Sequence, residues 1–193
     1  LNWSGDLLTA VSHSNGHKFT FEYNAHGRIS RLTDHAGRQT EFVYDASSEY
    51  LTRVTAAGGR VTMYEYNPST GTAADHALKS ITFPDGTHRY YNYDQYGRLV
   101  ELSRDDGAER VTLSYDQLGT VHVRDALGNV STLSLGSDGA LVGVRDALGN
   151  PLGLQYDERL NLVGMTASDG AQYDFSYDTL GNLTQSVDPL GAV

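Results

Sequence analysis

Hydrophobic and polar residues alternate along most of this chain in short runs, which are separated by turns that contain glycine. In the run at 38–44 (RQTEFVY), a period of two places Phe42 and Tyr44 on one face of an extended strand. A second short run covers residues 28–33, and the turns at 24–27 and 34–37 begin with Asn or Asp and end with Gly. Two strands and two turns in succession predict a β-hairpin that is linked to a further hairpin.

This pattern recurs at a nearly fixed period, and most repeats begin with tyrosine followed by an acidic or amide residue. The start tyrosines are Tyr23, Tyr44, Tyr66, Tyr93, Tyr115, Tyr156 and Tyr177, and Leu1 and Leu135 lie at the same phase. We therefore predict a single continuous array over residues 1–193. It has eight full repeats, starting near 1, 23, 44, 66, 93, 115, 135 and 156, and a partial repeat from 177. Because the chain begins and ends inside a repeat, we expect it to be a fragment of a longer protein.

The residue two positions before each later repeat start is always apolar. These residues are Phe21, Phe42, Tyr64, Tyr91, Leu113, Leu133, Leu154 and Phe175. Period-2 spacing places each on the same face as the following start residue, so stacked hairpins would carry two ladders of large side chains. Each aromatic ring brings about 150–250 Å² of surface to bury, so the ladders should provide most of the stability. The sequence thus predicts an all-β fold, a curved antiparallel sheet of tandem hairpins.

The first strand of each repeat is less regular. Its apolar residues lie three apart, as in Ile29 and Leu32, or Leu51 and Val54. Odd spacing cannot keep both on one face of a regular strand, so either a β-bulge intervenes or both faces are partly covered. A helical turn would also fit this spacing, but about six residues between glycine turns are too few for a typical helix.

The turn after each start residue, here called the first turn, carries the acidic residue and, four after the start, usually a glycine. The acidic positions include Asp45, Asp94, Asp116, Asp157 and Asp178, and the glycines include Gly27, Gly97, Gly119 and Gly181. Carboxylate pairs can hydrolyse glycosides, but aspartates that recur in every repeat are expected to bond the backbone of the turn. Leu160 stands where one of these glycines is expected, which leaves the local geometry there open. We predict no catalytic, cofactor-binding or metal-binding residue and no enzyme activity.

Two further features invite a binding interpretation. Residues 68–76 form an insertion in the first turn of one repeat, and insertions in repeat arrays usually become surface loops. It is the best candidate for a local binding feature, although a passive loop is the simpler interpretation. His13 and His17 are four residues apart, a spacing at which two histidines on a helix can bind zinc. Their segment, however, is predicted to be a turn and a strand.

The composition narrows the choice of partners. The formal net charge is −10 with only 14 Lys and Arg residues, which opposes binding to nucleic-acid phosphates. There is no cysteine, so neither a disulfide framework nor thiolate chemistry is available. No apolar run approaches the about 20 residues of a membrane-spanning helix.

The repeat resembles a known family. Tyr93-Asp94-Gln95-Tyr96-Gly97-Arg98-Leu99 and Tyr177-Asp178-Thr179-Leu180-Gly181-Asn182-Leu183 are similar to the YD repeat of bacterial Rhs proteins, a family that includes the C components of Tc toxins and the teneurins. This resemblance implies a strip of β-hairpins that spirals into a hollow shell. In the bacterial toxins, the shell encloses a C-terminal toxic domain until delivery, often by type VI secretion. The conserved core that closes the shell and carries autoproteolytic aspartates has no counterpart here.

The resemblance implies a structural shell segment of a secreted or surface-delivered bacterial Rhs-type toxin. Its partners would be the enclosed toxin domain and the remaining shell repeats. The alternative is a cell-surface module that binds carbohydrate or protein, because aromatic ladders also stack on sugar rings. Unpaired strands at the open sheet edges would favour self-association.

Overall fold

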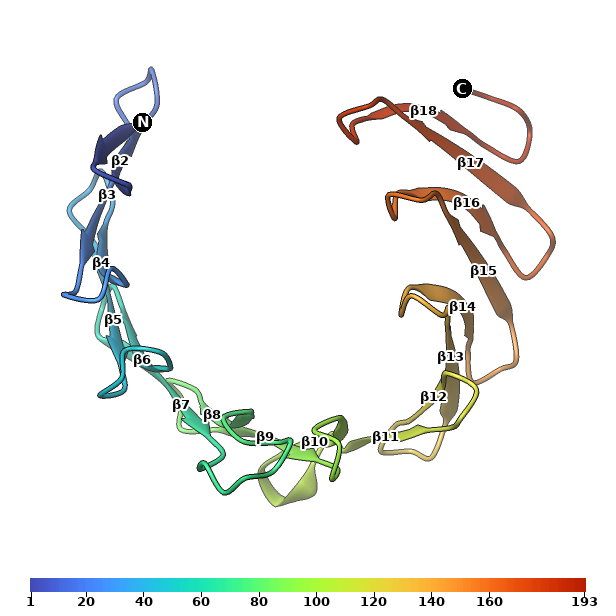
Figure 1. Cartoon of the computed structure of the whole chain (residues 1–193), viewed down its shortest axis with the longest axis horizontal. Helices are drawn as coiled ribbons and strands as arrows, with labels where there is room; N and C mark the ends of the chain where they lie inside the picture. The colour runs from blue at the N-terminus through green and yellow to red at the C-terminus, as the bar shows by residue number, and fades with distance from the viewer. The chain divides into compact units, whose positions relative to one another are not determined.

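The computed structural model describes all 193 residues and divides into two compact parts, Leu1–Gly107 and Ala108–Val193. Both parts consist of antiparallel strands joined by tight turns (Figure 1). The only helical element is a short 3-10 turn, η1, at Asp105–Gly107, and the structure contains no helix long and apolar enough to cross a membrane. The predicted all-β class is confirmed.

The N-terminal part contains ten strands. They are β1 (Asn2–Ser4), β2 (Leu7–Ser12), β3 (Lys18–Tyr23), β4 (Ile29–Thr33), β5 (Gln39–Tyr44), β6 (Leu51–Ala56), β7 (Arg60–Tyr66), β8 (Leu78–Thr82), β9 (His88–Tyr93) and β10 (Leu99–Arg104). Each strand pairs antiparallel with the strand that follows it in the chain. The result is a simple meander, and within this part the strands follow one another along a curved sheet (Figure 1).

The C-terminal part contains eight strands with the same connectivity. They are β11 (Val111–Tyr115), β12 (Thr120–Arg124), β13 (Val130–Leu135), β14 (Leu141–Arg145), β15 (Pro151–Tyr156), β16 (Leu162–Thr166), β17 (Gln172–Tyr177) and β18 (Leu183–Val187). Consecutive strands are again antiparallel partners. Because successive turns of a meander alternate between two edges, the first turns lie on one edge. The second turns, which close the other end of each hairpin, lie on the opposite edge.

A β-bulge resolves the odd spacing of apolar residues in the first strands. Tyr23 pairs with Ile29 and Phe21 with Leu32, and the register shifts by one residue between these pairs. The extra residue turns both aliphatic side chains to the face that carries the aromatic ladders. The same shift recurs where β5, β7, β13, β15 and β17 each pair with the following strand.

Strand β12 pairs with β11 without a bulge. Its apolar residues Val121 and Val123 lie two apart, and they pair with Tyr115 and Leu113 without any shift in register. A spacing of two already keeps both valines on one face, so no bulge is needed. The spacing in the sequence therefore matches the presence or absence of the bulge.

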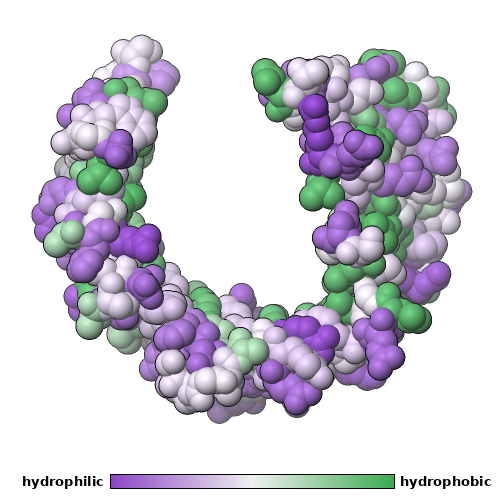
Figure 2. Space-filling model, in the orientation of Figure 1, coloured by the Kyte–Doolittle hydropathy of each residue, from purple (hydrophilic) through white to green (hydrophobic).

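The sheet has an apolar face, here called the ladder face, and a polar face. On the polar face, Arg31 lies between Glu22 and Glu41, at 3.3 and 3.1 Å from their carboxylate oxygens. No large side chain is fully buried, and Ala10 and Val121 are the only buried hydrophobic residues. Figure 2 accordingly shows hydrophobic and hydrophilic residues intermixed over the visible surface of each part. Stability in such a single-layer sheet depends on contacts between neighbouring strands.

Candidate functional site

Several first turns share one hydrogen-bonded geometry. In the last of them, the Asp178 N–H donates to the Asn182 carbonyl at 2.9 Å, and the Gly181 N–H donates to the Asp178 carbonyl at 3.1 Å. Gly181 has a φ of +82°, which suits the left-handed residue that closes a three-residue hairpin loop. Gly27, Gly97 and Gly119 have positive φ values at the same position.

Where a first turn starts with aspartate, the carboxylate bonds the backbone that follows it. One oxygen of Asp178 accepts the N–H groups of Leu180 and Asn182, both at 2.9 Å, and the other accepts the Asn182 amide at 2.9 Å. These bonds, led by the one from the Asn182 side chain, hold the pKa of Asp178 below its usual value. Asp157 has the corresponding partners, and its pKa is lowered for the same reason. A carboxylate held ionised in this way is poorly suited to act as a general acid.

Other first turns use variants of this arrangement. Asp45 accepts the N–H groups of Glu49 and Tyr50, and Asp116 those of Leu118 and Thr120. Asp94 accepts the N–H groups of Tyr96 and Arg98 and also pairs with the Arg98 guanidinium at 2.8 Å. The amide oxygen of Asn24 takes the same role without a charge, accepting from His26 and Arg28.

Leu160 adopts the geometry that its neighbours achieve with glycine. Its φ is +63°, and its N–H donates to the Asp157 carbonyl at 3.0 Å, as the turn glycines do. The turn therefore keeps its shape, although a left-handed leucine is strained by roughly 1–2 kcal/mol.

The start tyrosines connect successive repeats through their hydroxyl groups. The Tyr44 hydroxyl donates to the Ile29 carbonyl at 3.0 Å, and Ile29 is the residue that pairs with Tyr23, the preceding start tyrosine. The equivalent bonds join Tyr23 to Leu8, Tyr66 to Leu51 and Tyr93 to Leu78, over 2.7 to 2.9 Å. Burial raises the pKa of Tyr66 and of Tyr93, so both stay protonated as donors. Tyr156 and Tyr177, in the C-terminal part, make no such bond.

The insertion is a compact loop built around one carboxylate. Asp75 accepts the backbone N–H groups of Thr70, Gly71 and Thr72 at 2.8 to 3.1 Å and the Thr72 hydroxyl at 2.7 Å. These bonds, with the Thr72 hydroxyl contributing most, strongly lower the pKa of Asp75. The carboxylate that would be the obvious ligand group of this loop is therefore used within the loop itself.

The same loop lies against the repeats on both sides of it. The His76 ring stacks on Tyr50 with a centroid distance of 4.9 Å and an interplanar angle of 9°. On the other side, a Cβ placed on Gly97 would lie 2.5 Å from the Ala73 carbonyl oxygen, so the backbone of the loop contacts the first turn of the following repeat. The sequence predicts a surface insertion here but not this docking, because nothing in the repeat pattern marks Ala73 and Gly97 as neighbours.

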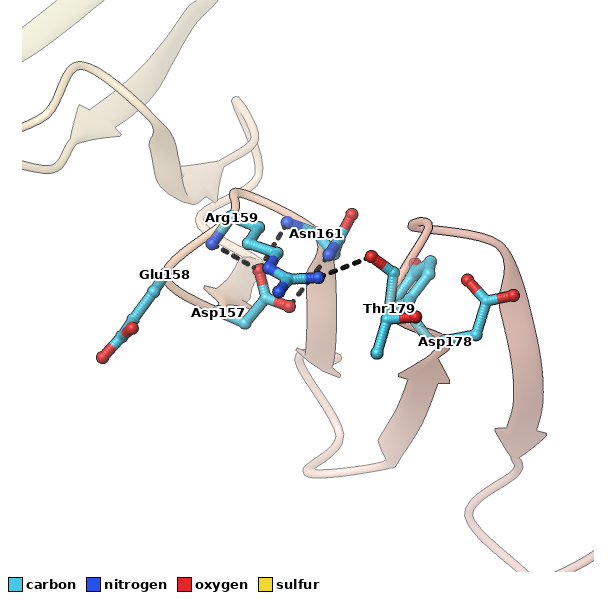
Figure 3. A pocket seen from close by; sticks show the side chains of 7 residues that line it. Asp157, Glu158, Arg159, Asn161, Asp178 and Thr179 are labelled. Carbon is cyan, nitrogen blue, oxygen red and sulfur yellow. Dashed lines mark hydrogen bonds between the residues drawn. The ribbon is translucent and has the colours of Figure 1, made fainter.

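Arginines in the first turns also link adjacent repeats. Arg28 donates to the Ser48 carbonyl at 3.2 Å, and Arg159 donates to the Thr179 carbonyl at 2.8 Å, each 20 residues along the chain. Figure 3 shows Arg159 reaching from its own turn to Thr179 across a shallow groove of about 350 Å³. The Asp157 carboxylate faces its own turn, and Glu158 points away from the neighbouring turn (Figure 3). The groove is thus a seam between two turns in which the polar groups bond each other.

Most histidines lie in turns, whereas His88 begins β9 and His122 lies within β12. His13 and His17 close one second turn, where the His13 N–H donates to the His17 carbonyl at 2.8 Å. The His17 ring stacks on His35 in the following second turn at 4.0 Å, and His88 pairs with Asp105 at 2.8 Å. No group of three or more potential metal ligands occurs in the structure.

Together, these features define a tandem β-hairpin repeat protein in which ladders and turns link each repeat to the following one. The family model of the RHS Repeat matches residues 23–49 and 156–193. The predicted Rhs/YD-repeat assignment is confirmed for these two stretches, which are RHS repeats.

Several proteins similar to this chain are toxins or toxin components. The chain is 34% identical over 85 residues to "Double-stranded DNA deaminase toxin A" of Burkholderia cenocepacia (strain H111), a match that covers 44% of this chain and 6% of the relative. A structure of the Photorhabdus luminescens Tc holotoxin pore with a TccC3 mutation matches with a TM-score of 0.53 and 13% identity. That match covers 91% of this chain and 12% of the neighbour. The TcdB2-TccC3 structure without the hypervariable C-terminal region matches at 0.50 with 16% identity over 89% of this chain and 11% of the neighbour. The chain therefore spans a small fraction of the length of these proteins.

Proposed function

We propose that this chain is a wall segment of a bacterial Rhs-type toxin, and that the wall encloses a C-terminal effector domain before delivery. One observation carries this proposal. The carboxylates in the turns, which are the groups that could act in catalysis, accept hydrogen bonds from the backbone of their own turns. Both oxygens of Asp157 and of Asp178 accept hydrogen bonds from their own turns, and the repeats are linked by tyrosine hydroxyls and arginines. Linked repeats of this kind would form a wall that needs no catalytic group, which is what enclosure requires.

The toxin relatives support the same function. The segment is related in sequence to a deaminase toxin and in fold to Tc toxin components. The partners of the wall would be the remaining repeats of the full-length protein and the enclosed effector, and the protein would be secreted or delivered from a bacterium. A structural role is consistent with the RHS repeats, and we assign no catalytic residue to this segment.

The proposal is tested by protease protection in the full-length protein. Phe42 and Tyr44 lie on the ladder face, where they pair with Val54 and Leu51. The double substitution Phe42→Ala and Tyr44→Ala should open the wall, because each aromatic-to-alanine change in a packed position costs up to about 3–5 kcal/mol. We expect the C-terminal region to resist protease in the wild type and to be cleaved rapidly in the variant.

The matched control is Lys79→Ala, since Lys79 is a partly exposed residue whose ion pair with Glu65 is long, at 3.6 Å. It should leave protection unchanged. Rapid cleavage of the C-terminal region in the wild-type protein would refute enclosure.

The alternative, a module that binds glycans or surface proteins, has a separate test. Tyr96 lies at a first-turn tip, is 67% exposed, and has the Arg98 guanidinium 5.1 Å from its ring centre. Glycan-array binding by the isolated chain that disappears in Tyr96→Ala would support that alternative and count against a purely structural role.

A further inference from the structure

The polar face of the N-terminal part carries two arginines at the same place in successive repeats, Arg31 in β4 and Arg53 in β6. Each directly precedes the second apolar residue of its strand. Arg31 pairs across the sheet with Glu22 on one side and Glu41 on the other, and both carboxylates bind its guanidinium. The charge of Arg31 is therefore compensated within the sheet.

Arg53 has a different environment. Its cross-strand neighbours are Val43 in β5 and Met63 in β7, which stand where Arg31 has its two glutamates. The Arg53 guanidinium makes no hydrogen bond and no ion pair in the structure. Arg53 is thus an exposed positive charge with an apolar residue on each side.

The carboxylates on the polar face of β5 and β7 are already bound. Glu41 in β5 binds Arg31 at 3.1 Å. Glu65 in β7 accepts a hydrogen bond from the Ser80 hydroxyl at 3.2 Å. A carboxylate that is free to bind Arg53 would therefore come from another molecule.

Val43 and Met63 offer apolar contact surface on the two sides of this charge. They are 38% and 48% exposed, and because neighbouring strands are about 4.8 Å apart, they lie about 10 Å from each other with Arg53 between them. Arginine and methionine are enriched at protein interfaces, where arginine often dominates the binding energy. Methionine also adapts its shape to different partners. We call these three residues the open-arginine site.

We propose that the open-arginine site binds an extended segment of a partner protein in which an acidic residue lies between two apolar residues. A carboxylate can form two parallel hydrogen bonds with the planar guanidinium. Side chains two positions apart in an extended segment point the same way, so the pattern apolar-x-acidic-x-apolar presents its carboxylate to Arg53 and its apolar side chains to Val43 and Met63. Nucleic-acid phosphates fit less well, because the net charge of −10 repels them and the apolar neighbours offer them no partner.

A labelled peptide tests this site directly. The probe is fluorescein-labelled Gly-Ser-Leu-Thr-Glu-Thr-Leu-Ser-Gly, titrated with the chain and followed by fluorescence anisotropy. We expect weak binding, with a Kd of about 0.1–1 mM, because three side-chain contacts bury little surface. Arg53→Gln should weaken binding at least about tenfold, since it removes the charged partner of the carboxylate, and the same peptide with Gln in place of Glu should bind equally poorly. The matched control Arg31→Gln should leave binding unchanged.

Two exchanges between the repeats separate binding from folding. Val43→Glu gives Arg53 an internal glutamate, as Arg31 has in the native chain, and should abolish peptide binding without loss of stability. The reverse exchange, Glu22→Val with Glu41→Met, leaves Arg31 free between two apolar residues. It should create a second site and about double the amount of peptide bound at saturation.

Three results would overturn the inference. They are no binding of the peptide by the unmodified chain up to about 1 mM, equal binding by the Arg53→Gln variant, or equal binding of the peptide that carries Gln. Displacement of the peptide by an equal concentration of a single-stranded DNA oligonucleotide would reject a peptide site in favour of a general anion site. Protease protection of the effector in the full-length protein tests enclosure separately, so a negative result here would reject the open-arginine site and retain the proposed function.

Discussion

Docking of the insertion loop on Gly97 gives the sharpest prediction about stability. Gly97 and Gly27 hold the same position in their first turns, with φ values of +77° and +73°. A Cβ on Gly27 would meet nothing within 4 Å, whereas one on Gly97 would lie 2.5 Å from the Ala73 carbonyl oxygen and 3.0 Å from its carbon. Gly97→Ala and Gly27→Ala therefore differ only in whether the loop is pushed away.

The expected magnitude follows from this difference. The left-handed backbone alone makes Gly27→Ala unfavourable by about 1 kcal/mol, after allowance for the reduced freedom of the unfolded chain. In Gly97→Ala, the added methyl group must also displace a backbone carbonyl, and overpacking of this kind costs about 1–3 kcal/mol more. We expect a total loss of roughly 2–4 kcal/mol from Gly97→Ala, or release of the loop from the turn.

Two measurements check this prediction. Urea unfolding compares the free energies of the variants, and limited proteolysis reports cleavage within residues 68–76. Gly97→Ala should be less stable than Gly27→Ala and should be cleaved faster in the loop. Equal unfolding midpoints with equal loop cleavage would refute docking of the loop on the turn.

Three other predictions concern the hydrogen bonds of the array. Tyr44→Phe should destabilise by about 1–3 kcal/mol in urea unfolding, because it leaves the half-buried Ile29 carbonyl without its donor. Asp75→Asn should make residues 68–76 sensitive to protease at neutral pH, because both carboxylate oxygens act as acceptors and an amide offers only one. Acidification should lower the urea midpoint below about pH 3.8, since the turn aspartates have lowered pKa values in the folded state and the unfolded chain therefore binds protons more readily.

Each of these has a matched control or a contrary outcome. Tyr177→Phe should change stability little, since the Tyr177 hydroxyl has no partner, and an equal loss in both variants would contradict the proposed role of the hydroxyl ladder. If the Asp75→Asn variant resists protease as well as the wild type does, contacts other than those of this carboxylate hold the loop. Asp157→Asn and Asp178→Asn should reduce the dependence of the urea midpoint on pH. Asn24 shows that an uncharged amide oxygen can accept the same two backbone hydrogen bonds. A urea midpoint that stays constant from pH 6 to pH 3 would exclude a contribution of these carboxylates to acid unfolding.

Much of the fold could be predicted from residue spacing because each repeat is built from local interactions. Period-2 alternation placed Phe42 and Tyr44 on one face, and glycine-containing turns marked the hairpin ends. The spacing of three between Ile29 and Leu32 left two possibilities, a bulge or partial burial of both faces. The pairing with Tyr23 and Phe21 decides for the bulge, since only the partner strand fixes the register.

Other features depended on contacts between repeats and could not be predicted in this way. The acceptor of the Tyr44 hydroxyl lies 15 residues back along the chain, and the Arg159 acceptor lies 20 residues ahead. Leu148 in the turn at 146–150 is 89% exposed, and this exposure depends on the geometry of the turn, which the repeat pattern alone does not give.

The sequence by itself determined the hairpin period, the positions of the turns and the residues of the ladders, because these follow from short-range backbone preferences and from alternation along a strand. Only the tertiary structure decided how neighbouring repeats are joined. The bond from Tyr44 to Ile29, the docking of the loop on Gly97 and the outward direction of Leu148 all depend on the stacking of one hairpin on another. Stacking brings together atoms that no pattern within a single repeat relates, so its consequences appear only in three dimensions.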